Sequence, residues 1–286
     1  MDDIMIDAIH DAYIYTDTEK LDSIWNSLHD TNLIKFYQAQ YSENGENYAL
    51  DGIKNKTLWL SSPFNFNDPF DCILNFDYTN EVVSVCKGIS ERLYGVEFTE
   101  EFLRYPSIDK KLSELIEQMN GRVSNIMPIP NIYVSCFSEI DNLHSLRMWA
   151  HYANNHTGFC AEYDFDTLNQ SVPFGCIPVK YTKDFSREIH ANSIEASTKN
   201  FLKMVFNKSD EWSYEKEWRL AQEIEGVSND GVNIDFALPK KIYLGCKSCV
   251  TLKEELFYIC KYNQIELYQM YIQPGTFSLY EKKIEF

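Results

Sequence analysis

Hydrophobic residues recur with helical spacing over the first 32 residues, among many Asp and Glu side chains. A spacing of three or four residues places apolar side chains on one face of a helix, so residues 1–32 are predicted to form one or two amphipathic helices. The apolar positions in this pattern are Ile6, Ile9, Tyr13, Leu21, Ile24, Trp25 and Leu28. We expect this acidic segment to be an N-terminal helical extension of the domain that follows.

Beyond residue 32, short apolar runs alternate with segments of helical spacing. The short runs predict strands at 33–37, 57–61, 132–137, 158–165, 177–181, 214–224, 241–245, 265–272 and 276–284. The helical spacing predicts helices within 48–55, 80–125, 142–154, 196–207 and 252–263. Many short strands with inserted helices favour an α+β fold with mixed, mostly antiparallel sheets. No repeat or linker interrupts residues 33–286, so they are predicted to form a single domain.

The composition narrows the classes of partner. The chain has 286 residues and a formal net charge of −17, and such a field repels phosphate backbones, so duplex nucleic acid is a poor partner. A small anionic ligand remains compatible, because a few local donors outweigh a distant screened field. The eight cysteines lie mostly in apolar runs, and neither a signal peptide nor an apolar stretch of about 20 residues is found. These features predict a cytoplasmic protein with reduced thiols and no membrane segment.

Charged and aromatic residues alternate along residues 214–220. On the predicted strand, Glu215, Glu217 and Arg219 share one face, and the two carboxylates lie about 6–7 Å apart, at roughly 3.3 Å per residue. One carboxylate of such a pair can steady a developing cation or a sugar hydroxyl, while the other takes a proton from an attacking nucleophile. The alternative is a solvated edge strand on which Arg219 neutralises its neighbours.

The segment around residues 148–158 is predicted to be a helix that closes with Gly158 at its C′ position. On this helix, His151 and Asn155 lie one turn apart. His151 and His156 are five residues apart, which is not the spacing of a helical metal pair, so no metal site is predicted. A histidine here can hold a ligand amide or phosphate, or can titrate near physiological pH. A satisfied structural side chain is the alternative for each of them.

Residues 61–71 read as an irregular loop rich in Pro, Asn and Asp. Side chains such as Asn67 and Asp68 can accept from backbone amides and fix one loop shape, and a shaped loop beside a strand end is a common ligand wall. The alternative is a capped turn whose Phe side chains fill the core. Cys246-x-x-Cys249 is only a weak metal or redox signal, because structural zinc needs four ligands.

The order of several motifs resembles a bacterial family known as domain of unknown function 2971. The resemblance spans roughly residues 33–250. The motifs are Lys35-Phe36, Leu58-Trp59-Leu60-Ser61-Ser62-Pro63, Phe66-Asn67-Asp68-Pro69-Phe70-Asp71, Val134-Ser135-Cys136-Phe137-Ser138-Glu139, Met148-Trp149-Ala150-His151-Tyr152, His156-Thr157-Gly158-Phe159 and Trp212-Ser213-Tyr214-Glu215-Lys216-Glu217-Trp218-Arg219. Their common order makes the resemblance specific, although the family itself implies no activity.

The same arrangement remotely resembles the ADP-ribosyltransferase fold. In that fold a first strand supplies a basic or polar NAD contact, a middle strand a serine or aromatic residue, and a later strand the catalytic glutamate. The resemblance therefore implies an ADP-ribosyltransferase-like core in which Glu217 and Glu215 are catalytic and NAD is the substrate. The residues implied to contact NAD are Lys35, Tyr37, Ser61, Asn67, Asp68, Ser135, Trp149, His151, Tyr152, His156 and Arg219. Trp149, Phe159 or Trp218 would stack on nicotinamide or wall the pocket.

The resulting hypothesis is an enzyme that cleaves the nicotinamide–ribose bond of NAD and transfers ADP-ribose to a protein or nucleic-acid acceptor or to water. By analogy, its setting would be a bacterial toxin or an anti-phage effector. The alternative is a non-catalytic module that senses a nucleotide or binds a protein partner through the acidic N-terminal helices. A nuclease using His151, His156, Glu162 and Asp164 is disfavoured by the negative charge and the missing metal spacing.

Overall fold

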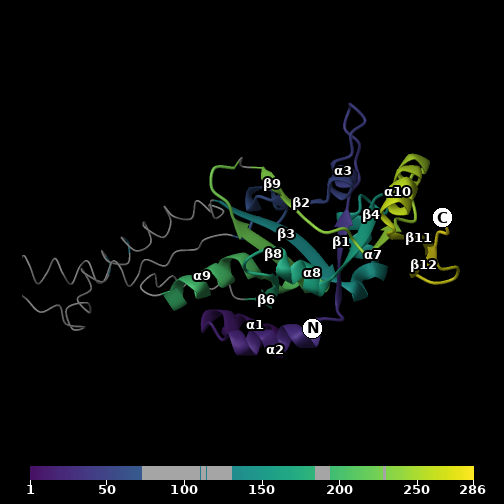
Figure 1. Ribbon diagram of the computed structural model, residues 1–286. Helices are drawn as coiled ribbons and strands as arrows, with labels where there is room; N and C mark the ends of the chain where they lie inside the picture. The colour runs from purple at the N-terminus through teal and green to yellow at the C-terminus, as the bar shows by residue number, and fades with distance from the viewer. Residues whose placement is uncertain (73–109, 111–113, 115–130, 184–193, 228–229) are drawn as a thin grey trace, which may run out of the picture.

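The computed structural model describes residues 1–72, 110, 114, 131–183, 194–227 and 230–286 (Figure 1). Its helices are α1 (Asp3–Ile14), α2 (Thr18–Leu28), α3 (Tyr48–Asn55), α7 (Leu146–Tyr152), α8 (Phe165–Gln170), α9 (Ile194–Phe206) and α10 (Val250–Asn263), with 3₁₀ helices η1 (Pro63–Asn65), η2 (Ile140–His144) and η3 (Asp210–Glu215). Its strands are β1 (Asn32–Tyr37), β2 (Thr57–Ser61), β3 (Ile132–Glu139), β4 (Phe159–Asp164), β5 (Cys176–Pro178), β6 (Lys180–Thr182), β7 (Asn207–Ser209), β8 (Glu217–Glu223), β9 (Gly231–Asp235), β10 (Lys241–Leu244), β11 (Glu266–Ile272) and β12 (Leu279–Lys283). This confirms a mixed α+β fold with mostly antiparallel strand pairs.

The two N-terminal helices form as their sequence predicts. Asp2 caps α1 by accepting a hydrogen bond from the Met5 amide at 2.9 Å, and Asp17 caps α2 in the same way. Such caps satisfy amides that have no partner inside the helix. Ile6 and Ile9 are buried on the inner face of α1, which packs on α2 and on α9 (Figure 1). Within the described residues, no helix has the length and hydropathy needed to cross a bilayer.

Most strands belong to one large sheet, in the order β12-β11-β10-β4-β1-β3-β2-β9. All of its pairs are antiparallel except β10 with β11, which α10 connects as a parallel crossover. The predicted C-terminal hairpin is present as β11 and β12. A separate parallel pair joins β6 and β7. The sheet thus places the first strand of the chain between β3 and β4, two strands from its middle.

The sheet branches at β3. One edge of β3 pairs with β8 along residues 132–138. The other edge pairs with β2 only at Val134 and with β1 only at Ser138 and Glu139. Strands β1 and β2 therefore leave β3 at different points, and residues 135–137 lie between them.

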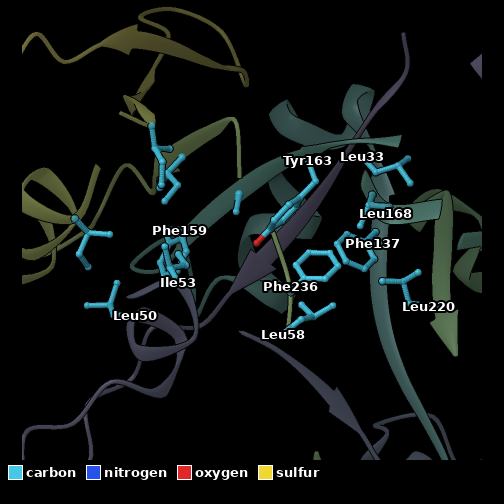
Figure 2. Packing of buried hydrophobic residues seen from close by; sticks show 14 of the residues in the cluster. Leu33, Leu50, Ile53, Leu58, Phe137, Phe159, Tyr163, Leu168, Leu220 and Phe236 are labelled. Atoms are coloured by element: carbon cyan, nitrogen blue, oxygen red, sulfur yellow. The ribbon is translucent and has the colours of Figure 1, made fainter. Parts of the chain in front are cut away.

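Apolar side chains fill both faces of the sheet. The largest cluster, shown in part in Figure 2, lies beneath α3, α8 and α10 and includes Leu33, Leu50, Phe137 and Leu220. On the opposite face, one cluster lies under α1 and α9 and another lies under α7. Each fully buried Leu or Phe contributes about 1.5–3 kcal/mol relative to an exposed one. This packing gives the sheet a fixed framework for the polar groups described below.

Several predicted element boundaries need correction. The predicted strand 214–224 begins only at Glu217, because η3 includes Tyr214 and Glu215. The predicted helix 142–154 is η2 followed by α7, which ends at Tyr152, and residues 154–156 have left-handed backbone angles. Gly158 is therefore no helix cap; a Cβ atom there would lie 2.0 Å from the Tyr37 carbonyl oxygen. The helices predicted within 80–125 lie outside the described residues, apart from positions 110 and 114.

Candidate functional site

The candidate site is built around the junction between η3 and β8. Glu215 is the last residue of η3, and Glu217 is the first residue of β8. Lys216 between them has a left-handed φ of 45°, which non-glycine residues seldom adopt. The prediction that Glu215 shares a strand face with Glu217 and Arg219 is therefore wrong, because Glu215 precedes the strand. Both carboxylates nevertheless reach the same neighbours, because the chain turns at Lys216 before the strand begins.

Buried polar groups fix this junction. Asn142 of η2 donates through Nδ2 to the carbonyl oxygens of Tyr214 at 3.0 Å and Glu215 at 2.8 Å. The Ser138 hydroxyl donates to the same Glu215 carbonyl oxygen. The Glu217 amide donates to the Tyr181 hydroxyl at 2.8 Å. These hydrogen bonds hold the backbone of Glu215 and Glu217 in place, and this determines where the two side chains start.

Arg219 is fully buried at the centre of the site. Its two terminal nitrogens donate to both carboxylate oxygens of Asp71, at 2.8 and 2.7 Å. Its Nε donates to Glu217 at 2.7 Å and one terminal nitrogen to the Val205 carbonyl oxygen at 2.6 Å. A planar guanidinium suits such paired contacts with carboxylates. Arg219 thus ties the residue-71 loop to strand β8 and to the end of α9.

Lys208 of β7 joins the two glutamates. Its ammonium donates to Glu215 at 2.7 Å and to Glu217 at 2.9 Å, and it lies 3.7 Å from Asp71. Tyr152 of α7 donates its hydroxyl to the other oxygen of Glu215. The cluster therefore contains three carboxylates and two cations, all less than a tenth exposed, and it carries one excess negative charge. We call these five charged residues and Tyr152 the β8 network.

The two glutamates differ in acidity. Burial raises the pKa of Glu215 above its ordinary value, even though Lys208 acts in the opposite direction. Burial would also raise the pKa of Glu217, but Arg219 and Lys208 overcome this effect and hold it well below the ordinary value. Burial would lower the pKa of Lys208, yet the neighbouring carboxylates raise it. Opposite charges and desolvation thus make Glu217 a fixed anion and Glu215 the group able to bind a proton.

Lys35 lies beside the network at the branch of the sheet. Its ammonium donates to the Cys136 carbonyl oxygen at 3.2 Å and lies 5.5 Å from the Phe137 ring centre. Desolvation lowers the Lys35 pKa, and the nearby Cys136 and Glu217 partly oppose this effect. Ser135 on the same stretch of β3 is buried, and its hydroxyl has no hydrogen-bond partner among the described residues. Two predicted NAD contacts, Lys35 of β1 and Ser135 of β3, therefore lie on adjacent strands. Both are close to the short stretch of β3 that pairs with neither β1 nor β2.

The predicted Trp–His segment lies mainly in the core. Trp149 is fully buried, and its indole nitrogen donates to the Leu143 carbonyl oxygen at 2.6 Å. The His156 ring stacks against Trp149, with 6.4 Å between ring centres, and desolvation lowers the His156 pKa. In the part of the chain that the structure describes, its Nδ1 has no hydrogen-bond partner. His151 is exposed. Phe159 and Trp218 are also buried, so the three aromatic residues expected to stack on nicotinamide lie in the packed interior.

The remaining predicted contacts are dispersed. Tyr37 stacks on Phe159 and shares a hydrogen bond with the Tyr163 hydroxyl at 3.2 Å. Ser61 is half-buried at the end of β2, and Asn67 is exposed. Asp68 is buried and caps a turn by accepting from the Phe70 amide at 2.9 Å. The loop around residues 67–71 therefore includes a capped turn, as the alternative interpretation expected, but Phe64 and Phe70 are exposed and do not fill the core.

Two members of the network were missed as site residues from sequence. Asp71 lies within the loop 61–71, which was predicted to be a ligand wall, but nothing in the sequence of that loop indicates that Arg219 is its partner. Lys208 directly follows a predicted amphipathic helix, and nothing in its local sequence distinguishes it from a surface lysine. The sequence does imply that a further cation lies near Arg219, because Glu215 and Glu217 together need more than one cation once they are buried.

Among the described residues, no group of three or more His, Cys, Asp or Glu side chains is arranged to hold a metal ion. Residues 148–220 match the model of a family described as "Protein of unknown function (DUF2971)". No curated protein and no solved structure gave a significant match. The matched segment contains Tyr152, Lys208, Glu215, Glu217 and Arg219, so the chain is similar to this family over the residues that supply most of the β8 network.

Proposed function

We propose that the protein is an ADP-ribosyltransferase-like enzyme that cleaves the nicotinamide–ribose bond of NAD. ADP-ribose would pass to a macromolecular acceptor or to water. The observation that carries the proposal is the convergence of Glu215 and Glu217 on one buried network with an excess negative charge. This is the charge that a reaction through a cationic sugar requires.

Stability alone is a poor reason for such a network. Removing several charges from water costs free energy, and well-packed apolar residues of similar volume often stabilise a protein as much or more. Strongly shifted pKa values also concentrate at functional sites. The opposite shifts of Glu215 and Glu217 support assigning them different chemical roles.

The order of the strands gives further support. In the resembling fold, the NAD contact, the middle polar residue and the glutamate lie on separate strands. Here Lys35 lies on β1, Ser135 on β3 and Glu217 on β8, and β3 pairs with both of the other strands. An ADP-ribosyltransferase-like core is accordingly part of the proposal, and a role as a bacterial toxin or anti-phage effector is what that resemblance implies.

The two glutamates are assigned different roles because their pKa values are shifted in opposite directions. Glu217, held ionised by Arg219 and Lys208, provides the permanent negative charge near the reacting sugar. The bond between the ribose C1′ and the nicotinamide nitrogen breaks, and nicotinamide leaves with the bonding electron pair. An acceptor hydroxyl, amine or water then forms the new bond to C1′. Glu215 takes the proton that this nucleophile loses, which its raised pKa favours.

The test is NAD cleavage by the purified protein, alone and with a cell extract, using nicotinamide release and transfer of labelled ADP-ribose as readouts. We expect Glu215→Gln to lower kcat by about 100-fold or more, as is typical for loss of a general base. Thermal unfolding should change little, because glutamine can still accept from Tyr152. Glu217→Gln should also inactivate the enzyme, with a larger loss of stability.

A matched control is Glu211→Gln, which alters an exposed carboxylate of the same 3₁₀ helix and should leave cleavage unchanged. Absence of NAD cleavage by the wild-type protein under both conditions would contradict the proposal. Full activity in both the Glu215→Gln and the Glu217→Gln variants would do so as well.

A non-catalytic nucleotide-sensing or protein-binding module is the second candidate. Both glutamates already have cationic partners inside the protein, and this observation favours a network that stabilises without reacting. Such a module would show thermal stabilisation by a nucleotide or a partner chain without turnover. Measuring stabilisation and nicotinamide release on the same sample separates the two functions.

A further inference from the structure

A second feature lies where the N-terminal helices meet η2 and the start of β8. A hollow of about 350 Å³ is lined there by α1, the end of α2, the end of β3 and the start of β8. This volume is within the usual range for small-molecule sites. Its apolar walls come from Met1, Met5, Leu28, Ile140 and Trp218.

The charged side chains of the lining are acidic, and Thr31 and Asn32 add neutral polar groups. Asp2, Glu139 and Asp141 contribute three carboxylates to the hollow. The ionised groups opposing them are the Met1 ammonium, 2.5 Å from Glu139, and Lys216, 3.0 Å from Asp141. One negative charge is left over, and a carboxylate oxygen can accept more than one hydrogen bond. The Met1–Glu139 pair also shows that an ammonium group fits against this wall.

The surroundings strengthen this negative potential. Residues 1–32 contain eight Asp and Glu residues but only one lysine. Most of these carboxylates, including Asp3 and Asp30, are exposed around the hollow's two helices. Such a field raises the local concentration of cations and disfavours anions. The apolar walls suit the body of an organic cation better than a hydrated metal ion.

We infer that this hollow binds an organic cation, an alkylammonium or alkylguanidinium group with an apolar stem. The stem lies against Met5, Leu28 and Ile140, and the cationic head meets Asp141 and Asp2. The site is separate from the proposed NAD chemistry. It nevertheless borders that chemistry, because Asp141 and Glu139 pair with Lys216, the residue between the two network glutamates.

The experiment is calorimetric titration of the full chain, without NAD, with n-butylguanidinium and with neutral pentanamide and anionic pentanoate of similar size. We expect the guanidinium to bind with a Kd of about 1 mM, and the other two to bind at least about tenfold more weakly. Asp141→Asn should weaken guanidinium binding several-fold. Met5→Trp, which fills the hollow without changing charge, should abolish it.

Glu254→Gln is the matched control, because it removes an exposed carboxylate on α10, outside the hollow, and should leave the affinity unchanged. Equal binding of guanidinium and pentanamide would overturn the inference. So would unchanged guanidinium affinity in folded Met5→Trp protein. Since no step of this titration requires NAD, its outcome is independent of the test of the proposed function.

Discussion

Two groups of buried carboxylates that form ion pairs, one on β4 and one in the β8 network, differ in their partners. On β4, Glu162 accepts from the Asn32 side-chain Nδ2 at 2.8 Å, the Lys241 ammonium at 3.0 Å and the Tyr243 hydroxyl at 2.5 Å. One anion meets one cation there, and Lys241 is one-third exposed. In the β8 network, three carboxylates share two cations, and Arg219 is fully buried.

This difference separates a structural ion pair from a candidate reaction centre. At Glu162 the charges cancel, and the lysine can reach water if the pair is broken. In the β8 network, removal of one cation leaves two excess negative charges away from water, which is costly. The excess charge therefore makes the β8 network a candidate for function, whereas the balanced pair at Glu162 needs no function beyond packing.

The largest effect is expected from Arg219→Met. It leaves Asp71 and Glu217 without their main partner, so the free energy of unfolding should fall by about 3–5 kcal/mol. Denaturant-induced unfolding followed by circular dichroism measures this change. Arg147→Met is the control, because Arg147 is exposed and its guanidinium carbon lies 4.4 Å from the Tyr214 ring centre. Its loss should cost about 0.5–1 kcal/mol. A similar small loss for Arg219→Met would show that the network does not hold the fold together.

The next effect compares the two lysines directly. Lys208→Met should lower the unfolding free energy by about 2–3 kcal/mol, less than the full cost of breaking a buried pair, because Glu215 can take up a proton and relieve part of the repulsion. Lys241→Met should cost within about 1 kcal/mol, since the lysine is partly exposed. Equal losses at the two positions, measured by the same unfolding titration, would remove the distinction between the clusters.

The elements of the fold were largely predictable, because hydrophobic spacing determines which faces are buried. The predictions of α1, α2, β1, α3, β2 and the C-terminal hairpin follow from local patterns that the tertiary structure keeps. The start of β8 was missed because η3 depends on Asn142 and Ser138, which are about 70 residues away in the chain. No local pattern contains that information.

The site was only partly predictable for the same reason. Glu215, Glu217 and Arg219 stand close together in sequence, and their charges suggested a common neighbourhood. Asp71 and Lys208 join them from distant segments, and the pairing of Arg219 with Asp71 spans 148 positions. Trp149 was expected at a ligand wall, yet an aromatic residue on an apolar helix face is equally suited to the core, where the structure places it.

The smallest effect, a dependence of stability on pH, separates the two glutamates within the network. The folded-state pKa of Glu217 lies below the ordinary value of 4.5. Its contribution to stability is therefore present above pH 4.5 and is lost as the pH falls below it. Because the folded-state pKa of Glu215 lies above 4.5, its contribution has the opposite sign and is lost as the pH rises through that higher value.

Unfolding titrations of the wild-type, Glu217→Gln and Glu215→Gln proteins between pH 3 and pH 8 test these signs. The stability advantage of wild type over Glu217→Gln should shrink by about 1–2 kcal/mol as the pH falls below 4.5. Relative to Glu215→Gln, the wild-type protein should instead lose stability as the pH rises above 4.5. If the unfolding free energies of the two variants change with pH in parallel, the two glutamates do not differ in pKa as described. The assignment of Glu215 as the proton acceptor would then be wrong.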